Sequence, residues 1–321
     1  MNFDVFNGDA DGICSLIQLR LAEPRQTELV TGVKRDIELL QRVNAHTDDL
    51  ITVLDISFAK NVAAVNTLLD AGAHIFYIDH HQTGAVPEHP HLTTFLDTSA
   101  DVCSSLLVDR YLQGQFRAWA VVGAFGDNLL TSAKTLAKNL QLTTEQLQRF
   151  EELGTYINYN AYGSNISDLH IAPDQLFRQL VQYPSPVQFI EDCRALFEQL
   201  QTAYHADLAQ ACRIQPEFVS DNVHITRLPD QPWARRVCGV YSNQLANQNP
   251  QRAHAMLTPI AGDAYLVNVR AALTNKRGAD VVCSKFATGG GRAAAAGINR
   301  LPKEQLADFI VTLENFFGDV N

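Results

Sequence analysis

Short apolar runs alternate with amphipathic stretches along the first 130 residues of the chain. The apolar runs predict β-strands at residues 3–6, 27–33, 50–56 and 74–78, and the stretches between and after them predict helices at 12–21, 36–43, 60–71 and 106–112. Strands that alternate with helices are typical of an α/β domain, in which a parallel sheet carries helices on both faces. Ligands of such sheets bind at the carboxyl ends of the strands, so the residues that follow each strand are the first candidates for a functional site.

The pattern changes near residue 134 and again near residue 213. Residues 134–212 have no strand signal and predict helices, with a break at 158–165. Strands return at 223–228, 237–241, 254–259 and 264–271, and further helices are predicted at 281–286 and 303–317. We therefore predict an α/β first domain with a helical linker region at 1–212, a hinge or linker at 213–222, and a smaller α/β second domain at 223–321.

Composition narrows the classes of function. The chain has 321 residues, of which 46% are hydrophobic and 19% charged, and this excludes disorder as the dominant state. The formal net charge of -10 argues against a broad basic face for long duplex DNA. The chain contains no apolar run near the ~20 residues that span a membrane, so we expect no membrane partner. Six scattered cysteines without a Cys-x-x-Cys pair predict reduced thiols and a cytoplasmic location.

Four acidic or histidine signals follow apolar runs that predict strands. They are Asn7-Gly8-Asp9-Ala10-Asp11-Gly12, Asp55, Asp79-His80-His81, and Asp127, which follows the apolar run at 118–124. Taken singly, each is more often a helix cap, a turn residue or a surface residue. Together they predict carboxylates converging at one edge of the sheet, where cations must neutralise their repulsion. A mixture of carboxylate and imidazole suits Mn²⁺, with Mg²⁺ or Co²⁺ as alternatives.

The order of these motifs resembles that of the DHH phosphoesterase superfamily: Asp-x-Asp, a lone Asp, Asp-His-His, a further Asp, and a C-terminal Gly-Gly-Gly-x. The family includes RecJ-type exonucleases and nanoRNases, and the resemblance covers nearly the whole chain. It implies that one metal ion is held by Asp11, Asp55, His80 and Asp127. It implies that a second ion is held by Asp9 and Asp55, with Asn7 at the position where the family usually has histidine. The amide oxygen of Asn7 is a weaker ligand than imidazole.

The resemblance also assigns roles to the rest of the Asp-His-His motif. Two ions would clamp the substrate phosphate and lower the pKa of a bridging water. Asp79 is expected to fix the ring of a neighbouring histidine, and His81 to bind the phosphate or assist proton transfer.

A second group of candidate residues lies near the C-terminus, at Gly289, Gly290, Gly291 and Arg292. Consecutive glycines let the backbone approach an anion closely, although most glycine runs are flexible turns. The segment resembles the Gly-Gly-Gly-His loop of the DHH-associated domain, with Arg292 in place of the histidine. We expect Arg270 and Lys285 to join Arg292 in binding substrate, since arginine suits the geometry of phosphate. The alternative for Arg270 is a surface salt bridge.

These features together predict a metal-dependent phosphodiesterase or exonuclease. Its expected substrates are short single-stranded nucleic acids or dinucleotides, which metal-activated water would hydrolyse to nucleoside monophosphates. The alternatives are a RecJ-like exonuclease on longer single strands and a degenerate nucleotide-binding regulatory module.

Overall fold

The computed structural model describes residues 1–319 and divides into two compact units, Met1–Ala203 and the part of the chain from Tyr204 onward. The division falls inside α9 (Arg194–Ala211), on the N-terminal side of the segment predicted as a linker. Within residues 1–319, no helix has the length and apolar character needed to cross a membrane. Each unit has its own sheet and its own hydrophobic core, so each is described by itself.

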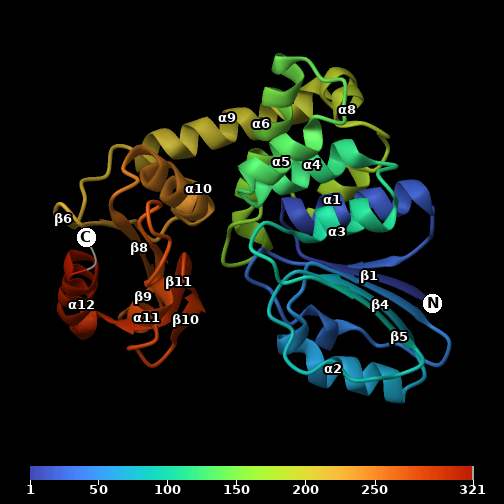
Figure 1. The fold of residues 1–321 in the computed structure, drawn as a ribbon, viewed down its shortest axis with the longest axis horizontal. Helices are drawn as coiled ribbons and strands as arrows, with labels where there is room; N and C mark the ends of the chain where they lie inside the picture. The colour runs from blue at the N-terminus through green and yellow to red at the C-terminus, as the bar shows by residue number, and fades with distance from the viewer. Residues whose placement is uncertain (320–321) are drawn as a thin grey trace. The chain divides into compact units, whose positions relative to one another are not determined.

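The first unit is built on a five-stranded parallel sheet with strand order β2-β1-β3-β4-β5, as the α/β prediction required (Figure 1). The strands are β1 (Asn2–Phe6), β2 (Glu28–Val30), β3 (Leu50–Leu54), β4 (His74–Asp79) and β5 (Leu92–Leu96). Strand β5 was not predicted from the sequence, because it lies at the edge of the sheet and alternates only between half-buried and exposed residues.

Helices cover both faces of this sheet. The helices of this unit that precede α9 are α1 (Ala10–Ala22), α2 (Phe58–Asp70), α3 (Ser104–Tyr111), α4 (Arg117–Gly126), α5 (Leu130–Ala137), α6 (Thr144–Asn160), α7 (Pro173–Leu180) and α8 (Pro186–Asp192). In Figure 1, α2 lies on one side of the sheet and α1 and α3 on the other. The α2 face buries alternate strand residues such as Val5, Val53 and Tyr77 against Phe58 and Leu68. The helix predicted at 36–43 is a single 3₁₀ turn, Leu39–Arg42.

The register of the central strands aligns their carboxyl ends. Phe6 pairs with Leu54, and Leu54 pairs with Ile78. The polar residues that come next, Asn7 and Asp55, therefore start from the same edge of the sheet as Asp79.

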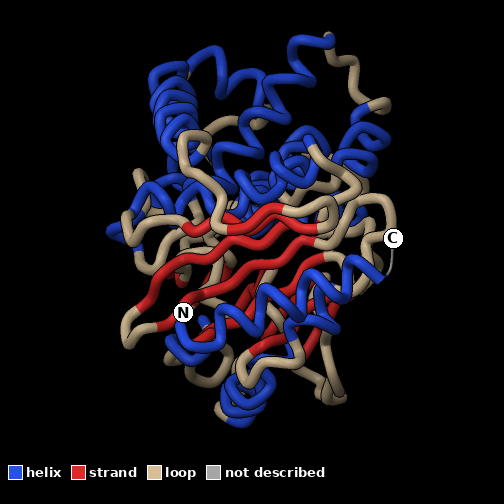
Figure 2. The backbone as a smooth tube through the Cα atoms, turned by 90° about the vertical axis from the view of Figure 1, so that its left-hand side faces the viewer, coloured by secondary structure: helices blue, strands red, loops and turns tan. Residues whose placement is uncertain are grey.

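The second unit has a six-stranded mixed sheet with strand order β10-β11-β9-β8-β7-β6. The strands are β6 (Phe218–Val219), β7 (Val223–Arg227), β8 (Ala253–Ile260), β9 (Ala264–Arg270), β10 (Gly289–Arg292) and β11 (Ala295–Pro302), and the helices are α10 (Pro232–Gln248), α11 (Ala279–Cys283) and α12 (Leu306–Asp319). Strands β7 and β8 are parallel, and the neighbouring pairs are antiparallel. Figure 2 shows α12 lying across the strands, where Phe309, Leu313 and Phe317 enter the core.

Three predictions for this unit were wrong in detail. Residues 237–241 were predicted as a strand because of their valines, but they lie inside α10. Ala234, Val237, Cys238, Tyr241 and Leu245 are buried there at helical spacing, after a proline at the first helical position. The helix predicted at 281–286 is the short α11, so Lys285 lies in the turn after it. The glycine segment expected as a loop is the edge strand β10.

Candidate functional site

The Asp-x-Asp motif forms the tight junction between β1 and α1. Asp9 caps the helix: its Oδ1 accepts hydrogen bonds from the backbone N–H of Asp11 at 3.0 Å and of Gly12 at 3.1 Å. A Cβ atom on Gly12 would lie 2.2 Å from the carbonyl oxygen of Asn7, so only glycine fits this turn. Asp9 is therefore a helix cap, as expected for an isolated Asp-x-Asp. The cap uses only Oδ1 of Asp9 and neither oxygen of Asp11.

Asp11 is held by the start of α3. Its Oδ2 and Oδ1 accept hydrogen bonds from the backbone N–H groups of Ser104 and Ser105, both at 2.7 Å. These donors have no partner inside their own helix, and the positive end of a helix dipole favours a carboxylate. The two contacts fix Asp11 across 93 residues of chain, at the buried end of the sheet.

Asp55 follows β3 in a left-handed backbone conformation, with φ of 58°. Such a conformation costs a non-glycine residue about 1–3 kcal/mol and is concentrated at functional sites. Its backbone N–H donates to the carbonyl of Ile78 at 3.1 Å, and its Oδ1 accepts from the Ser104 hydroxyl at 3.2 Å. The fold therefore turns a buried carboxylate toward the strand ends at a conformational cost.

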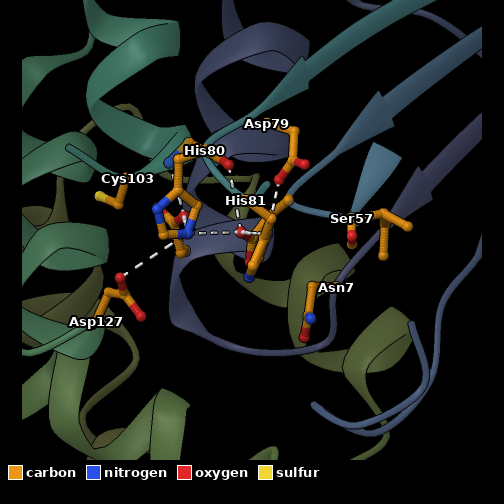
Figure 3. A network of polar contacts seen from close by, with 12 residues as sticks. Asn7, Ser57, Asp79, His80, His81, Cys103 and Asp127 are labelled. Carbon is orange, nitrogen blue, oxygen red and sulfur yellow. Dashed lines mark hydrogen bonds and ion pairs between the residues drawn. The ribbon is translucent and has the colours of Figure 1, made fainter. Parts of the chain in front are cut away.

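His80 brings the predicted ligands together. Its Nε2 lies 3.4 Å from Oδ1 of Asp55, 3.9 Å from Oδ2 of Asp11 and 4.0 Å from Oδ2 of Asp127. Figure 3 shows the His80 ring between Asp127 and the neighbouring His81. Asp55, His80 and His81 also offer ligand atoms that all lie within 4.8 Å of one another. The four side chains named for the first metal ion thus converge.

Asp127 reaches this cluster from a different element than predicted. It is the C-cap of α4, whereas the apolar run before it was expected to be a strand. That run is buried on every side, from Trp119 to Gly126, and a fully buried helix lacks the polar positions that distinguish it from a strand in the sequence.

The charge balance of the cluster favours a bound cation. Burial raises the pKa of Asp55 well above its ordinary value, and the charges of Asp11 and Asp9 raise it further. Burial also raises the pKa of Asp127, although Lys34 and His80 oppose that increase. Three carboxylates and an imidazole are donors that suit Mn²⁺ or Mg²⁺, and a divalent ion would remove the repulsion between them. The residues present therefore fit a metal ion at this position.

Asp79 and His81 form a hydrogen-bonded pair at the edge of the cluster, where Nδ1 of His81 lies 3.9 Å from Oδ1 of Asp55. Oδ1 of Asp79 lies 2.7 Å from Nδ1 of His81, and Oδ2 of Asp79 accepts a hydrogen bond from the N–H of Phe58. Burial disfavours the charged ring, but the hydrogen bond to Asp79 and the charge of Asp55 outweigh burial and raise the pKa of His81. The His81 side chain is 37% exposed and that of His80 is 4% exposed, so His81 is the histidine that solvent can reach.

Lys34 belongs to the site and was missed in the sequence. It forms an ion pair with Oδ2 of Asp9, donates to Oδ1 of Asn158 at 3.0 Å, and lies 3.8 Å from Oδ1 of Asp127. Burial lowers the pKa of Lys34, but the interactions with Asp9, Tyr162 and Asp127 together outweigh burial, and the pKa is raised well above its ordinary value. A signal was present in the sequence, because Lys34 directly follows the predicted strand 27–33. It was overlooked because only carboxylates and histidines were considered as candidates at the strand ends.

Asn7 forms hydrogen bonds through both the oxygen and the nitrogen of its side-chain amide. Its Oδ1 accepts from the backbone N–H of Asp9 at 3.2 Å, and its Nδ2 donates to the carbonyl oxygen of Lys34 at 3.2 Å. Asn7 therefore connects the loop after β1 to the loop after β2.

In the second unit, Arg270 and Arg292 share one face of the sheet. Both pair with Ala295 of β11, Arg270 from β9 and Arg292 from β10, so they flank this small residue in the same cross-strand row. Arg270 donates from Nε to Oδ1 of Asn243 on α10 at 3.2 Å, while Arg292 is exposed. The sheet thus places two of the predicted substrate-binding cations on the same face, one strand apart, and Lys285 is exposed in the turn before β10.

The three glycines before Arg292 differ in whether the structure requires glycine at their position. A Cβ atom on Gly289 would lie 1.7 Å from the carbonyl oxygen of Cys283, and Gly291 has φ of 144°. Both are needed for packing of β10. Gly290 is exposed and has open space where its Cβ would be, so its backbone is accessible.

Comparison with solved structures identifies the fold. Over 99% of the chain and 90% of a RecJ exonuclease bound to manganese, the TM-score is 0.56 at 17% sequence identity. The chain has the fold of the DHH phosphoesterases. The DHH fold is shared with the pGpG-specific phosphodiesterase PggH from Vibrio cholerae, at TM-score 0.54 and 14% identity over 99% of both chains. RecJ from Thermus thermophilus in complex with Mn²⁺ gives 0.56 at 15% identity, over 99% of this chain and 52% of that one.

The fold implied by the DHH resemblance is thus confirmed over 99% of the chain. No protein-family model and no curated protein sequence matches the chain.

Proposed function

We propose that this chain is a metal-dependent phosphodiesterase that hydrolyses dinucleotides or very short single-stranded oligonucleotides to nucleoside monophosphates. The observation that carries the proposal is the convergence of Asp11, Asp55 and Asp127 on His80 in a buried cluster, with Asp55 held in a left-handed conformation. Carboxylates are not buried together without a compensating cation unless they are protonated.

The four residues of this cluster would hold the metal ion, for which Mn²⁺ is our first choice and Mg²⁺ or Co²⁺ the alternatives. When bound, such an ion polarises a phosphate oxygen and lowers the pKa of a water ligand. The backbone donors from α3 and the Ser104 hydroxyl keep Asp11 and Asp55 oriented for this purpose.

His81 is the residue that we assign to the substrate phosphate. Asp79 binds its Nδ1, so Nε2 is the ring atom left to donate to a phosphate oxygen or to the leaving oxygen. Its raised pKa favours the protonated ring that such donation needs. Asp79 acts as a positioning residue, since it is fully buried and bound to the backbone of Phe58.

Arg270, Arg292 and Lys285 are proposed to hold a phosphate or base of the substrate away from the reacting centre. The cross-strand row in the second unit supports this role for the two arginines, and exposed Gly290 would let a substrate approach the backbone. Because the chain carries a net charge of -10, we favour a short substrate over a long polyanion. A RecJ-like exonuclease on longer single strands is the second candidate, supported by the shared fold.

The test is hydrolysis of 5′-phosphorylated RNA and DNA dinucleotides and of 20-nucleotide single strands with Mn²⁺, followed by chromatography of the products. We expect nucleoside monophosphates, faster release from a dinucleotide than from the long strands, and no release after chelation. Absence of hydrolysis with Mn²⁺, Mg²⁺ and Co²⁺ would refute the proposal, and faster release from the long strands would favour the second candidate. Asp70→Asn, an exposed carboxylate on α2, is the matched control for variants of the cluster.

A further inference from the structure

Lys34 is fixed by its backbone as well as by its ammonium group. Its N–H donates to the carbonyl of Ala161 at 2.9 Å, and its carbonyl accepts from Asn7. A Cβ atom on Gly8 would lie 2.0 Å from the carbonyl oxygen of Gly32, so the loops after β1 and β2 are in close contact. The lysine is therefore placed over Asp9 by the fold and not by a freely moving side chain alone.

The ammonium group lies among four polar side chains from three segments of the first unit. It contacts Asp9 and Asn158, lies 3.8 Å from Asp127, and lies 5.6 Å from the centre of the Tyr162 ring. An ammonium has three N–H donors. Asp9 and Asn158 accept two, and the separation from Asp127 is too long for a hydrogen bond. The side chain is 23% exposed, so a substrate oxygen can reach the third donor.

The same contacts occupy two of the three ligands expected for a second metal ion, Asp9 and Asn7. One oxygen of Asp9 accepts from the start of α1 and the other pairs with Lys34. The amide oxygen of Asn7 accepts from the N–H of Asp9, and the amide nitrogen is bound to Lys34. The residues present fit one ion, beside His80, and do not fit a second beside Asp9.

We propose that the Lys34 ammonium replaces a second metal ion, so that the chain binds one divalent ion and uses Lys34 to bind a substrate phosphate oxygen. The inference rests on the proposed phosphodiesterase function and specifies how many metal ions the site binds. A lysine supplies one positive charge and three donors where an ion would supply two charges and open coordination positions. Lys34 would thus steady the phosphate, while the ion beside His80 would remain the source of activated water.

The test is the number of Mn²⁺ ions bound per chain, measured by equilibrium dialysis and by the EPR spectrum of the bound ions. The proteins are the wild type, Asn7→His, the double variant Asn7→His/Lys34→Met, and Lys138→Met, which changes an exposed lysine of the same unit. Circular dichroism checks that each variant is folded. We expect one ion for the wild type, for Asn7→His and for Lys138→Met, and two spin-coupled ions for the double variant.

Two ions in the wild type would overturn the proposal, as would a folded double variant that still binds one. The result is separable from the proposed function, because dinucleotide hydrolysis is measured on the same samples. Hydrolysis with two bound ions refutes only the assignment of Lys34. One bound ion without hydrolysis of any ester refutes the phosphodiesterase and leaves the single-ion assignment standing. A wild type that binds no ion refutes both.

Discussion

The two units of this protein differ in where their candidate functional charges lie, buried in the first and exposed in the second. The first unit buries Asp9, Asp11, Asp55 and His80 at one edge of its sheet, although burying a charge is expensive unless it is paired. The second unit leaves Arg292 exposed on its sheet. It buries charges mainly as a pair, Asp207 with Arg236, whose atoms lie 2.8 Å apart. Under the proposed function, this difference separates chemistry from recognition: the costly buried cluster would hold the metal ion, and the exposed cations would bind the substrate.

The first unit also contains a buried ion pair outside this cluster. Arg20 donates from two nitrogens to the two carboxylate oxygens of Asp4, each at 2.8 Å, so this charge is satisfied within the protein. Asp55 has no such cation, and its pKa is raised as a result of burial and its acidic neighbours. Burial alone therefore does not mark the site; the missing counter-charge does.

The largest effect is expected at Asp55. Asp55→Asn keeps a residue type that tolerates the left-handed backbone, but removes the charge shared by the cluster. Turnover of a dinucleotide with Mn²⁺ should fall to the uncatalysed background. The unfolding midpoint of the metal-free protein should stay the same or rise, because a repulsive charge is lost. Hydrolysis close to that of the Asp70→Asn control would show that the cluster is not the reacting centre.

A smaller loss is expected at Lys34. Lys34→Met removes a charge-assisted hydrogen bond worth roughly 1.5–3 kcal/mol, or about 10- to 150-fold in kcat/KM. Because Lys34 lies beside Asp127 of the cluster, the loss should affect dinucleotides and bis-p-nitrophenyl phosphate alike. Steady-state kinetics on both esters, with Lys138→Met as control, measure it. A loss on dinucleotides alone would move Lys34 away from the scissile phosphate.

The substrate face of the second unit should behave differently. Arg292 is exposed, so Arg292→Ala should cost about 10-fold in kcat/KM, the low end of a charge-assisted contact. The loss should fall on 5′-phosphorylated dinucleotides and spare bis-p-nitrophenyl phosphate, which has no second anchor. Kinetics at fixed salt and saturating Mn²⁺ measure the ratio. Equal losses on both substrates would place Arg292 at the scissile phosphate, and no loss would leave the glycine segment a purely structural strand.

The smallest effect concerns stability of the second unit. Burial lowers the pKa of His254 to about 4 from 6.5, so the neutral ring is favoured in the fold. The unfolded chain binds a proton at this histidine below pH 6.5, whereas the folded unit does so only near pH 4. The free energy of unfolding therefore falls as the pH drops from 6.5 toward 4, by about 1 kcal/mol at pH 5.5. His254→Gln should remove this acid sensitivity, measured by hydrogen exchange of β8 and β9 amides at pH 7 and 5.5, without changing hydrolysis. An unchanged pH dependence would contradict the buried neutral ring.

The sequence was sufficient to predict the parallel sheet and the convergence of the strand-end residues. Asp11, Asp55 and His80 follow directly from that geometry, because parallel strands end at one edge. Asp127 was predicted through a strand that is a helix, since complete burial hides helical periodicity. Lys34 was missed because a lysine at a strand end looks like a solvated charge until Asp9 and Asn158 are seen around it.

The second unit was harder to predict because its strands are mostly antiparallel, so the order of elements along the chain does not fix their neighbours. The glycine segment shows why. Gly289 and Gly291 are explained by contacts with Cys283 and Ala296, which are formed only when β10 pairs at the edge of the sheet. A run of glycines in a sequence does not distinguish this packing from a mobile loop.

The most direct test is a crystal grown with Mn²⁺ and measured at the manganese absorption edge. The account predicts one anomalous peak, bounded by the side chains of Asp11, Asp55, His80 and Asp127, with the Lys34 ammonium beside Asp9. A peak between Asp9 and Asn7, or no peak beside His80, would contradict it.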